Sequence, residues 1–210
     1  MRIGILGTGT MAAALAHAWQ RAGHAVVVGG RSPQKAAAIA SRPGISVLPP
    51  RQVPLGTDAV IIAVTWEGVD EALSAAGART GSLAGLTVID CTNPVDFATG
   101  VLKPDRDSAV EHIARLAPGA HLVKALHLYA GQGWLTPRQP NEPPRVVAMC
   151  GDDPAALDTA GTLVRDLGGT PVVIGGLERG RQLEEVAGFV VRLVGLGVDP
   201  ATPVPAVPAR

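Results

Sequence analysis

The sequence has no excess of charge of either sign, no long apolar run and only two cysteines. Its 210 residues include 18 basic and 18 acidic side chains, and this balance argues against binding to nucleic acid or to an anionic membrane. The two cysteines, Cys91 and Cys150, are too far apart for a metal motif and are expected to be reduced core thiols. No apolar run reaches the roughly 18 residues of a membrane span, and the N-terminus lacks the regions of a signal peptide. We therefore expect a cytoplasmic protein without nucleic-acid or membrane partners.

What the sequence does contain is a regular alternation of strand and helix patterns. Apolar β-rich runs such as residues 2–6 and 58–64 alternate with helical patterns such as residues 152–169. Candidate helix caps at Ser32, Ser108 and Asp152 or Asp153 mark where helices begin. This alternation predicts an α/β fold built on a mainly parallel sheet.

Two proline-rich segments interrupt the alternation. Residues 136–145 and 199–210 carry four prolines each, so neither can form a helix interior or a central strand. We expect the tail to be an extended or disordered end, with an arm packed on a partner subunit as the alternative.

The first βα turn has the pattern Gly-x-Gly-x-x-Ala. Gly7 would form the tight turn, Gly9 would let the backbone approach a pyrophosphate, and Ala12 would let the helix lie against the strand. An apolar strand precedes the turn, an amphipathic helix starts in it, and a second strand ends about 20 residues later. The free N–H groups of the helix N-terminus would attract phosphates. The sequence therefore predicts a dinucleotide site rather than a βα turn without a ligand.

The end of the second strand indicates which dinucleotide is bound. NAD sites place an acid there for the ribose hydroxyls, whereas this chain has Arg31 and Ser32, with Lys35 one helical turn further on. An arginine can grip a 2′-phosphate or stack on adenine, and the serine hydroxyl and the lysine ammonium can add to that site. We interpret these residues as selecting NADP(H); the alternative is a solvated basic helix start.

Four stretches resemble the NADPH-dependent reductases of the deazaflavin cofactor F420, also called F420-dependent NADP oxidoreductases. They are ILGTGTMAAALA with VVVGGRS, IAVTWEGVDEAL, LVKALHL, and the segment from Cys150 to Glu184 that begins CGDD and ends RQLE. The resemblance implies a Rossmann-type doubly wound sheet with a small C-terminal α/β extension. It also implies an NADP-binding domain over residues 1–130, a smaller capping portion over 131–198, the proline-rich tail over 199–210, and a homodimer.

The same resemblance implies F420 as co-substrate and a set of residues around the cofactor. Hydride would pass directly between the two rings, so positioning matters more than a dedicated acid or base. NADP(H) would be held by the residues of the glycine turn, by the residues expected to bind the 2′-phosphate, and by residues at the ends of three strands. These residues are Gly7, Thr8, Gly9, Thr10, Met11, Arg31, Ser32, Lys35, Val64, Thr65, Trp66, Asn93, Pro94 and His127.

No catalytic residue is certain from the sequence, and His127 and Tyr129 are the candidates. On a strand these two side chains would share a face, and either could donate a proton to a ketone or imine. Each has a simpler interpretation, a buried histidine with its hydrogen bonds satisfied and a tyrosine in the pocket wall. Trp66 and Trp134 are expected to pack rather than stack, although Trp134 could line a pocket.

Several charged side chains are candidates either for binding the second substrate or for the protein surface. Lys124, Arg138 and Arg145 are candidate bases for the phosphate and acidic tail of F420. Glu184 and Glu185 are expected at the surface or paired with Arg181. The sequence contains no recognisable metal cluster.

Three functions remain open from the sequence. The first is hydride transfer between NADP(H) and F420. The second is NADPH-dependent reduction of a small imine or carbonyl compound on the same scaffold. The third is a non-catalytic NADP-binding sensor.

Overall fold

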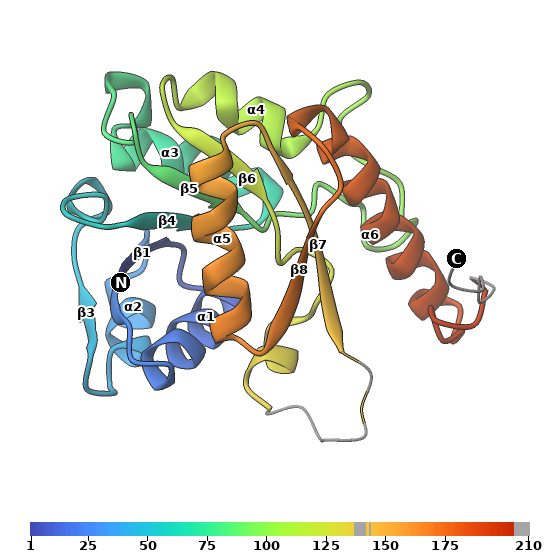
Figure 1. The fold of residues 1–210 in the computed structure, drawn as a ribbon, viewed down its shortest axis with the longest axis horizontal. Helices are drawn as coiled ribbons and strands as arrows, with labels where there is room; N and C mark the ends of the chain where they lie inside the picture. Colours follow the sequence, from blue (N-terminus) through green and yellow to red (C-terminus); the bar gives the residue numbers. More distant parts are fainter. Residues whose placement is uncertain (137–141, 143, 204–210) are drawn as a thin grey trace.

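A single eight-stranded sheet forms the centre of the molecule (Figure 1). The computed structural model describes residues 1–136, 142 and 144–203. The strand order is β3-β2-β1-β4-β5-β6-β7-β8, in which every neighbouring pair is parallel except β6 and β7. The strands are β1 (Arg2–Leu6), β2 (Ala25–Gly29), β3 (Ile45–Val47), β4 (Ala59–Ile62), β5 (Thr87–Asp90), β6 (His121–Lys124), β7 (Arg145–Gly151) and β8 (Gly169–Val173).

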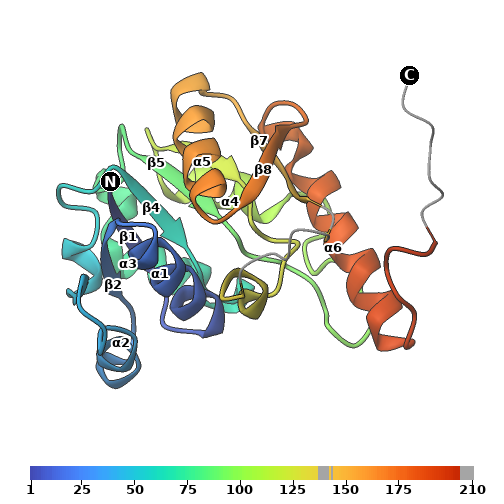
Figure 2. The same ribbon diagram turned by 60° about the horizontal axis from the view of Figure 1, so that its bottom comes forward.

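Helices cover both faces of the sheet, as the turned view in Figure 2 also shows. One apolar cluster joins α1, α2 and α5 to one face, and a second joins α3 and α4 to the other. The sixth helix, α6, contacts α4 and β7 and extends away from the parallel part of the sheet. The helices are α1 (Thr10–Arg21), α2 (Pro33–Ile39), α3 (Val69–Ala76), α4 (Ala109–Leu116), α5 (Pro154–Asp166) and α6 (Gly180–Gly195).

The core has the composition expected for a doubly wound sheet. All four residues of β4 are buried, as is typical of a parallel strand covered by helices on both faces. Trp19 on α1 is fully buried, and its indole N–H donates to the carbonyl of Leu163 on α5 at 2.9 Å. This contact joins the first and fifth helices across the same face of the sheet. The α/β prediction and the doubly wound topology are therefore confirmed.

Local cap signals place the helix starts as the sequence indicates. The Ser32 side chain accepts a hydrogen bond from the Lys35 amide at the start of α2. Ser108 and Glu111 form a complete capping box on α4. Asp153, rather than Asp152, caps α5 by accepting from Ala156.

One strand was not predicted from the sequence, and two predicted segments lie largely outside the described residues. The short edge strand β3 was not predicted, because its three residues are too few to show a period. The segment 136–145 and the tail 199–210 lie largely outside the described residues. In the described part of the chain, no helix is both long and apolar enough to cross a membrane.

Candidate functional site

The glycine turn between β1 and α1 is built as the pattern predicts. Gly7 has φ of 141°, and a Cβ there would lie only 2.1 Å from the carbonyl oxygen of Ala63, so a larger residue cannot occupy the position. Gly9 is the N-cap of α1, and a Cβ added to it would meet no atom within 4 Å. No side chain of the residues that the structure describes caps α1, so the N-terminus of this helix presents its partial positive charge to open space.

This turn opens into a cleft of about 910 Å³. The cleft runs along the carboxyl ends of the parallel strands, where ligands bind in doubly wound folds. Most of the predicted cofactor residues line it: Gly7, Thr8, Gly9, Thr10, Met11, Arg31, Ser32, Lys35, Val64, Thr65, Trp66 and Asn93. Pro94 and His127 are not among its lining residues.

Further lining residues were not predicted from the sequence. Ala72 and Ala75 of α3 line the cleft, and so do Pro50, Glu67, Cys91, Thr92, Val95, Phe97 and Lys103. Apart from Glu67 and Ala72, they lie outside the stretches that resemble the reductase family. Only the folded chain brings them to the same side of the sheet as the glycine turn.

At the end of β2, Arg31 is paired with an acid from a different element. Its guanidinium lies 2.8 Å from the carboxylate of Glu71 on α3, and both side chains are exposed. An acidic side chain therefore does stand near the predicted 2′-phosphate position, but it is already bound to a cation. An ion pair this exposed contributes about 0–1 kcal/mol, so a phosphate could compete for Arg31 at small cost.

Asn93 carries an unpaired buried polar atom on the cleft wall. Its side-chain amide donates to the carbonyl of His127 at 2.7 Å, while its Oδ1 is buried and has no hydrogen-bond partner in the described part of the chain. Such an acceptor is costly unless a ligand or water satisfies it. The chain turns sharply just before this contact, because Leu126 adopts a left-handed φ of 65°. A non-glycine residue in this conformation stores strain, which often marks a functional site.

His127 is buried beneath the cleft rather than exposed in it. Its Nε2 contacts the carbonyl of Leu183 on α6 at 3.1 Å, and its Nδ1 has no partner among the described residues. Burial, and then the charge of Lys124, lower the pKa of His127 to about 3. The imidazole is therefore neutral at physiological pH and is poorly suited to deliver a proton as imidazolium.

The expectation that His127 and Tyr129 share a strand face is wrong. Strand β6 ends at Lys124, so neither residue lies on it. The Tyr129 hydroxyl donates to the carbonyl of Val146 on β7 at 3.0 Å. Its ring packs edge-to-face on Trp134, which is buried as the packing interpretation predicts.

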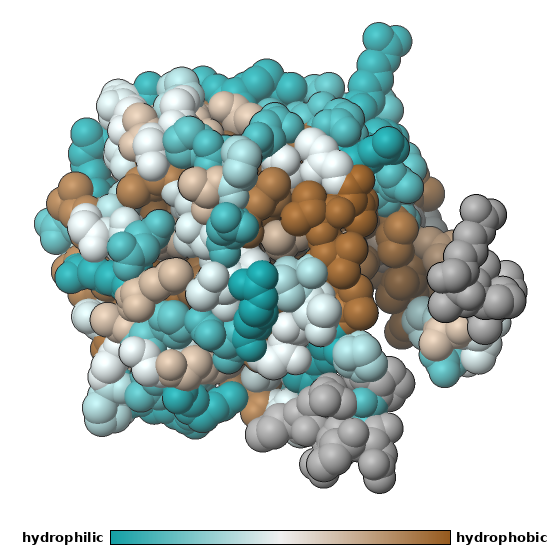
Figure 3. Space-filling view, viewed as in Figure 1, coloured by the Kyte–Doolittle hydropathy of each residue, from teal (hydrophilic) through white to brown (hydrophobic). Residues whose placement is uncertain are grey.

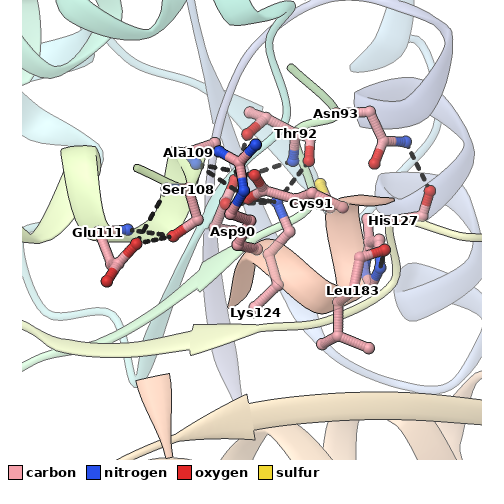
Figure 4. A network of polar contacts seen from close by, with 12 residues as sticks. Asp90, Cys91, Thr92, Asn93, Ser108, Ala109, Glu111, Lys124, His127 and Leu183 are labelled. Carbon is pink, nitrogen blue, oxygen red and sulfur yellow. Dashed lines mark hydrogen bonds and ion pairs between the residues drawn. The ribbon is translucent and has the colours of Figure 1, made fainter. Parts of the chain in front are cut away.

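A buried ionic cluster lies beside this region (Figure 4). The Nζ of Lys124 lies 2.8 Å from Asp90 Oδ2 and 2.9 Å from Glu184 Oε1, and all three side chains are fully buried. Burial by itself would lower the pKa of Lys124, but the two carboxylates raise it above its usual value, so the lysine stays charged. Burial raises the pKa of Glu184 against the opposing effect of Lys124.

The cluster also holds the backbone that borders the cleft. Lys124 donates to the carbonyl of Thr92 at 2.5 Å, and Asp90 accepts from both the amide and the hydroxyl of Thr92. Glu184 accepts from the amide of Ala109 at the start of α4. The cluster thus connects α6, the N-terminus of α4 and the strand end that carries Cys91, Thr92 and Asn93.

These contacts correct three expectations about charged residues. Lys124 is buried with two carboxylates and cannot reach a substrate in the cleft. Glu184 belongs to this cluster rather than to the surface, whereas Glu185 does pair with Arg181 at 3.0 Å. Arg145 donates to the carbonyl of Thr136 and does not line the cleft, and Arg138 lies outside the described residues.

The two cysteines are free and buried, as expected for core thiols. The Cys91 thiol donates to the carbonyl of Ile62, and burial raises its pKa to about 12, which keeps it protonated. Among the residues that the structure describes, no three His, Cys, Asp or Glu side chains gather into a candidate metal site.

Comparison with known proteins places this arrangement in context. Residues 2–94 match the family described as "NADP oxidoreductase coenzyme F420-dependent". A structure from Arthrobacter sp. FB24, described as a "putative F420 dependent NADP-reductase", is 30% identical with a TM-score of 0.78, covering 93% of this chain and 95% of that one. A Streptomyces aurantiacus imine reductase shares only the fold, at 18% identity and a TM-score of 0.64 over 93% of this chain and 61% of that chain.

A curated relative is longer than this chain. The rat metalloreductase STEAP3 is 29% identical over 185 residues, which cover 88% of this chain. The match spans only 36% of the length of the rat protein, so the chain resembles one part of it.

Proposed function

The chain belongs to the F420-dependent family of NADP oxidoreductases, and on that premise we propose that it transfers a hydride between NADP(H) and the deazaflavin F420. The observation that carries the proposal is the match to the Arthrobacter protein, which extends over 95% of that chain and so reaches well beyond the nucleotide-binding turn. In the reaction, NADPH gives up a hydride and becomes NADP⁺, and F420 takes that hydride together with one proton from water.

The residues present fit NADP(H). The uncapped N-terminus of α1 and the open space above Gly9 suit a pyrophosphate, and the buried, unpaired Oδ1 of Asn93 suits a hydrogen-bond donor such as a carboxamide. Arg31 suits a 2′-phosphate after it leaves Glu71. We propose that the cofactor is held by Gly7, Thr8, Gly9, Thr10, Met11, Arg31, Ser32, Lys35, Val64, Thr65, Trp66 and Asn93, with Pro94 and His127 supporting Asn93 from behind.

The task of the protein in this reaction is positioning. Hydride transfer between two rings needs them to be close and shielded from water, and it needs no side-chain acid. The neutral, buried His127 and the carbonyl-bound Tyr129 hydroxyl agree with that requirement. His127 acts through its carbonyl, which orients the Asn93 amide and so aims Oδ1.

The direct test is spectroscopic. Purified protein is mixed with NADPH and F420, and the absorbance of the oxidised deazaflavin is followed. We expect bleaching that depends on both NADPH and protein. If the deazaflavin band is unchanged while the protein binds NADPH, the F420 assignment is wrong and reduction of an imine or carbonyl compound becomes the leading hypothesis.

We also propose that the chain forms a homodimer. Among the described residues, strand β8 is an edge strand that pairs with β7 alone, and its Val172 and Val173 are exposed. Figure 3 shows apolar surface gathered over β7 and β8 and continuing toward α6, where Phe189 is exposed. Exposed edges and apolar patches of this kind are usually covered by a partner. Light scattering by the purified protein tests whether it is a dimer.

The cytoplasmic location and the domain boundaries remain predictions.

A further inference from the structure

A small hairpin follows β5 and forms one wall of the cleft. Val95 and Leu102 make an antiparallel bridge, and the Asp96 amide donates to the Val101 carbonyl at 2.8 Å. The Asp96 carboxylate closes the turn by accepting from the amides of Ala98 and Thr99, and these bonds lower the pKa of Asp96. The hairpin is therefore a built element and not a loose connection.

The hairpin is seated directly on α6. A Cβ at Gly100 would lie 2.6 Å from the Gly188 carbonyl oxygen, and a Cβ at Gly188 would lie 2.3 Å from the Gly100 carbonyl oxygen. Such close approach of two backbones requires glycine at both positions. Helix α6 thus fixes the position of the hairpin relative to the glycine turn on the opposite side of the cleft.

The hairpin presents an aromatic ring to the cleft. Phe97 is one of two phenylalanines in the chain, and it lines the cleft while 69% of its surface is exposed. Val95 at the base of the hairpin is buried and lines the same cleft, so the ring stands on a fixed support. Exposed aromatic rings on rigid supports are favoured anchors for ligands, because little conformational freedom is lost on binding.

A cation lies on the same wall. The ammonium of Lys103, just after the hairpin, forms an ion pair with the carboxylate of Glu67, and both side chains line the cleft and are partly exposed. The Lys103 amide donates to the carbonyl of Pro94 at 2.7 Å, which ties this residue to the Asn93 end of the cleft. An exposed pair like this one is weak, so an anionic phosphate can replace the Glu67 carboxylate.

We propose that Phe97 and Lys103 form the binding wall for the hydride acceptor, and that this acceptor combines a planar ring with an anionic group. Phe97 stacks on the ring or on its side chain, and Lys103 receives the phosphate. The inference rests on the proposed function, since it deepens the same site by naming the residues that recognise F420. It replaces Lys124 and Arg145 as the candidate bases for that substrate, whereas Arg138 lies outside the described residues.

The experiment uses the full chain and two acceptors, F420 and the deazaflavin that lacks the phosphate and the acidic tail. For Lys103→Gln we expect the KM for F420 to rise about tenfold, on the scale of one charge-assisted hydrogen bond, with no change for the shorter acceptor. Glu67→Gln should lower the KM for F420, because it removes the competing carboxylate.

Phe97→Ala should raise the KM for both acceptors about tenfold, as expected for a lost stacking contact, and Phe97→Tyr should restore it. The matched control is Val101→Ala, since Val101 is 64% exposed on the same hairpin but does not line the cleft. NADPH binding, measured by nicotinamide fluorescence, should stay within about twofold of wild type in all variants.

The outcomes separate this inference from the proposed function. If wild type reduces F420 but Phe97→Ala and Lys103→Gln behave like Val101→Ala, the binding wall is wrong and the proposed function stands. If wild type does not reduce either deazaflavin, the proposed function fails. The wall is then tested by titrating flavin mononucleotide, a planar ring with one phosphate, into NADP⁺-loaded protein; equal affinity for wild type and Lys103→Gln overturns it.

Discussion

Replacement of Lys124 by methionine tests the role of the buried ionic cluster. Methionine keeps most of the length of the lysine side chain but removes the charge that lies 2.8 Å from Asp90 and 2.9 Å from Glu184. Both carboxylates are fully buried, so they would lose their cation without gaining water. Removing one partner of a buried pair in this way costs about 3–5 kcal/mol.

The expected consequence is a large loss of thermal stability. For a chain of this size, 1 kcal/mol corresponds to about 2–4 °C, so Lys124→Met should lower Tm by about 6–20 °C. The measurement is thermal and urea unfolding followed by circular dichroism. The control is Arg115→Gln, because Arg115 makes a 2.7 Å pair with Asp107 in which both side chains are 55% exposed. That surface pair should contribute less than about 1 kcal/mol.

The stability loss caused by Lys124→Met should also depend on pH. Without Lys124, nothing offsets the effect of burial on Glu184, so the folded pKa of Glu184 rises further above its usual value. A group whose folded pKa is raised contributes stability at low pH that is lost as pH rises through that folded pKa. The deficit of Lys124→Met should therefore be smaller at pH 5 than at pH 8.

A combined variant identifies the source of the loss. Adding Glu184→Gln to Lys124→Met removes one of the stranded charges and should recover part of the lost stability. A Tm for Lys124→Met within about 2 °C of wild type would refute the view that the cluster is a buried, mutually dependent unit.

The remaining predictions concern the cofactor, the turn and the region behind the site. Arg31→Asp should weaken NADPH binding far more than NADH binding in fluorescence titrations; equal losses would mean that the end of β2 does not read the 2′-phosphate. Gly7→Ala should abolish nucleotide binding and destabilise the fold, since its Cβ would lie 2.1 Å from a carbonyl oxygen, and normal binding by this variant would contradict that geometry. Tyr129→Phe should change the turnover of F420 little; a loss of 100-fold or more in kcat, the scale of general acid catalysis, would instead favour a carbonyl or imine substrate. The pKa of His127 is lowered to about 3, so wild-type stability should fall as pH drops from about 6.5 toward 3, and His127→Gln should reduce that fall in urea titrations at several pH values.

The amino-acid sequence by itself determined the features that depend on neighbours along the chain. Ser32 and Ser108 act within four residues of themselves, so their caps can be read from spacing alone. For α5 the spacing allows Asp152 or Asp153, and the structure selects Asp153. The glycine spacing of the turn can also be read locally, although the Ala63 carbonyl oxygen that leaves no room for a Cβ at Gly7 comes from the end of β4. The alternation of strands and helices then implies the parallel sheet and puts the turn at its carboxyl edge.

Only the tertiary structure decided which distant charges meet. Glu71 lies 40 positions from Arg31, and Glu184 lies 60 positions from Lys124, yet each pair is in contact. No local pattern distinguishes buried Glu184 from exposed Glu185, because burial depends on which face of α6 meets β6 and α4. The seat of the Phe97 hairpin on α6 is likewise a contact between segments nearly 90 residues apart, made by glycines at Gly100 and Gly188. Local chemistry thus specified the nucleotide turn, while long-range packing selected the residues that face it across the cleft.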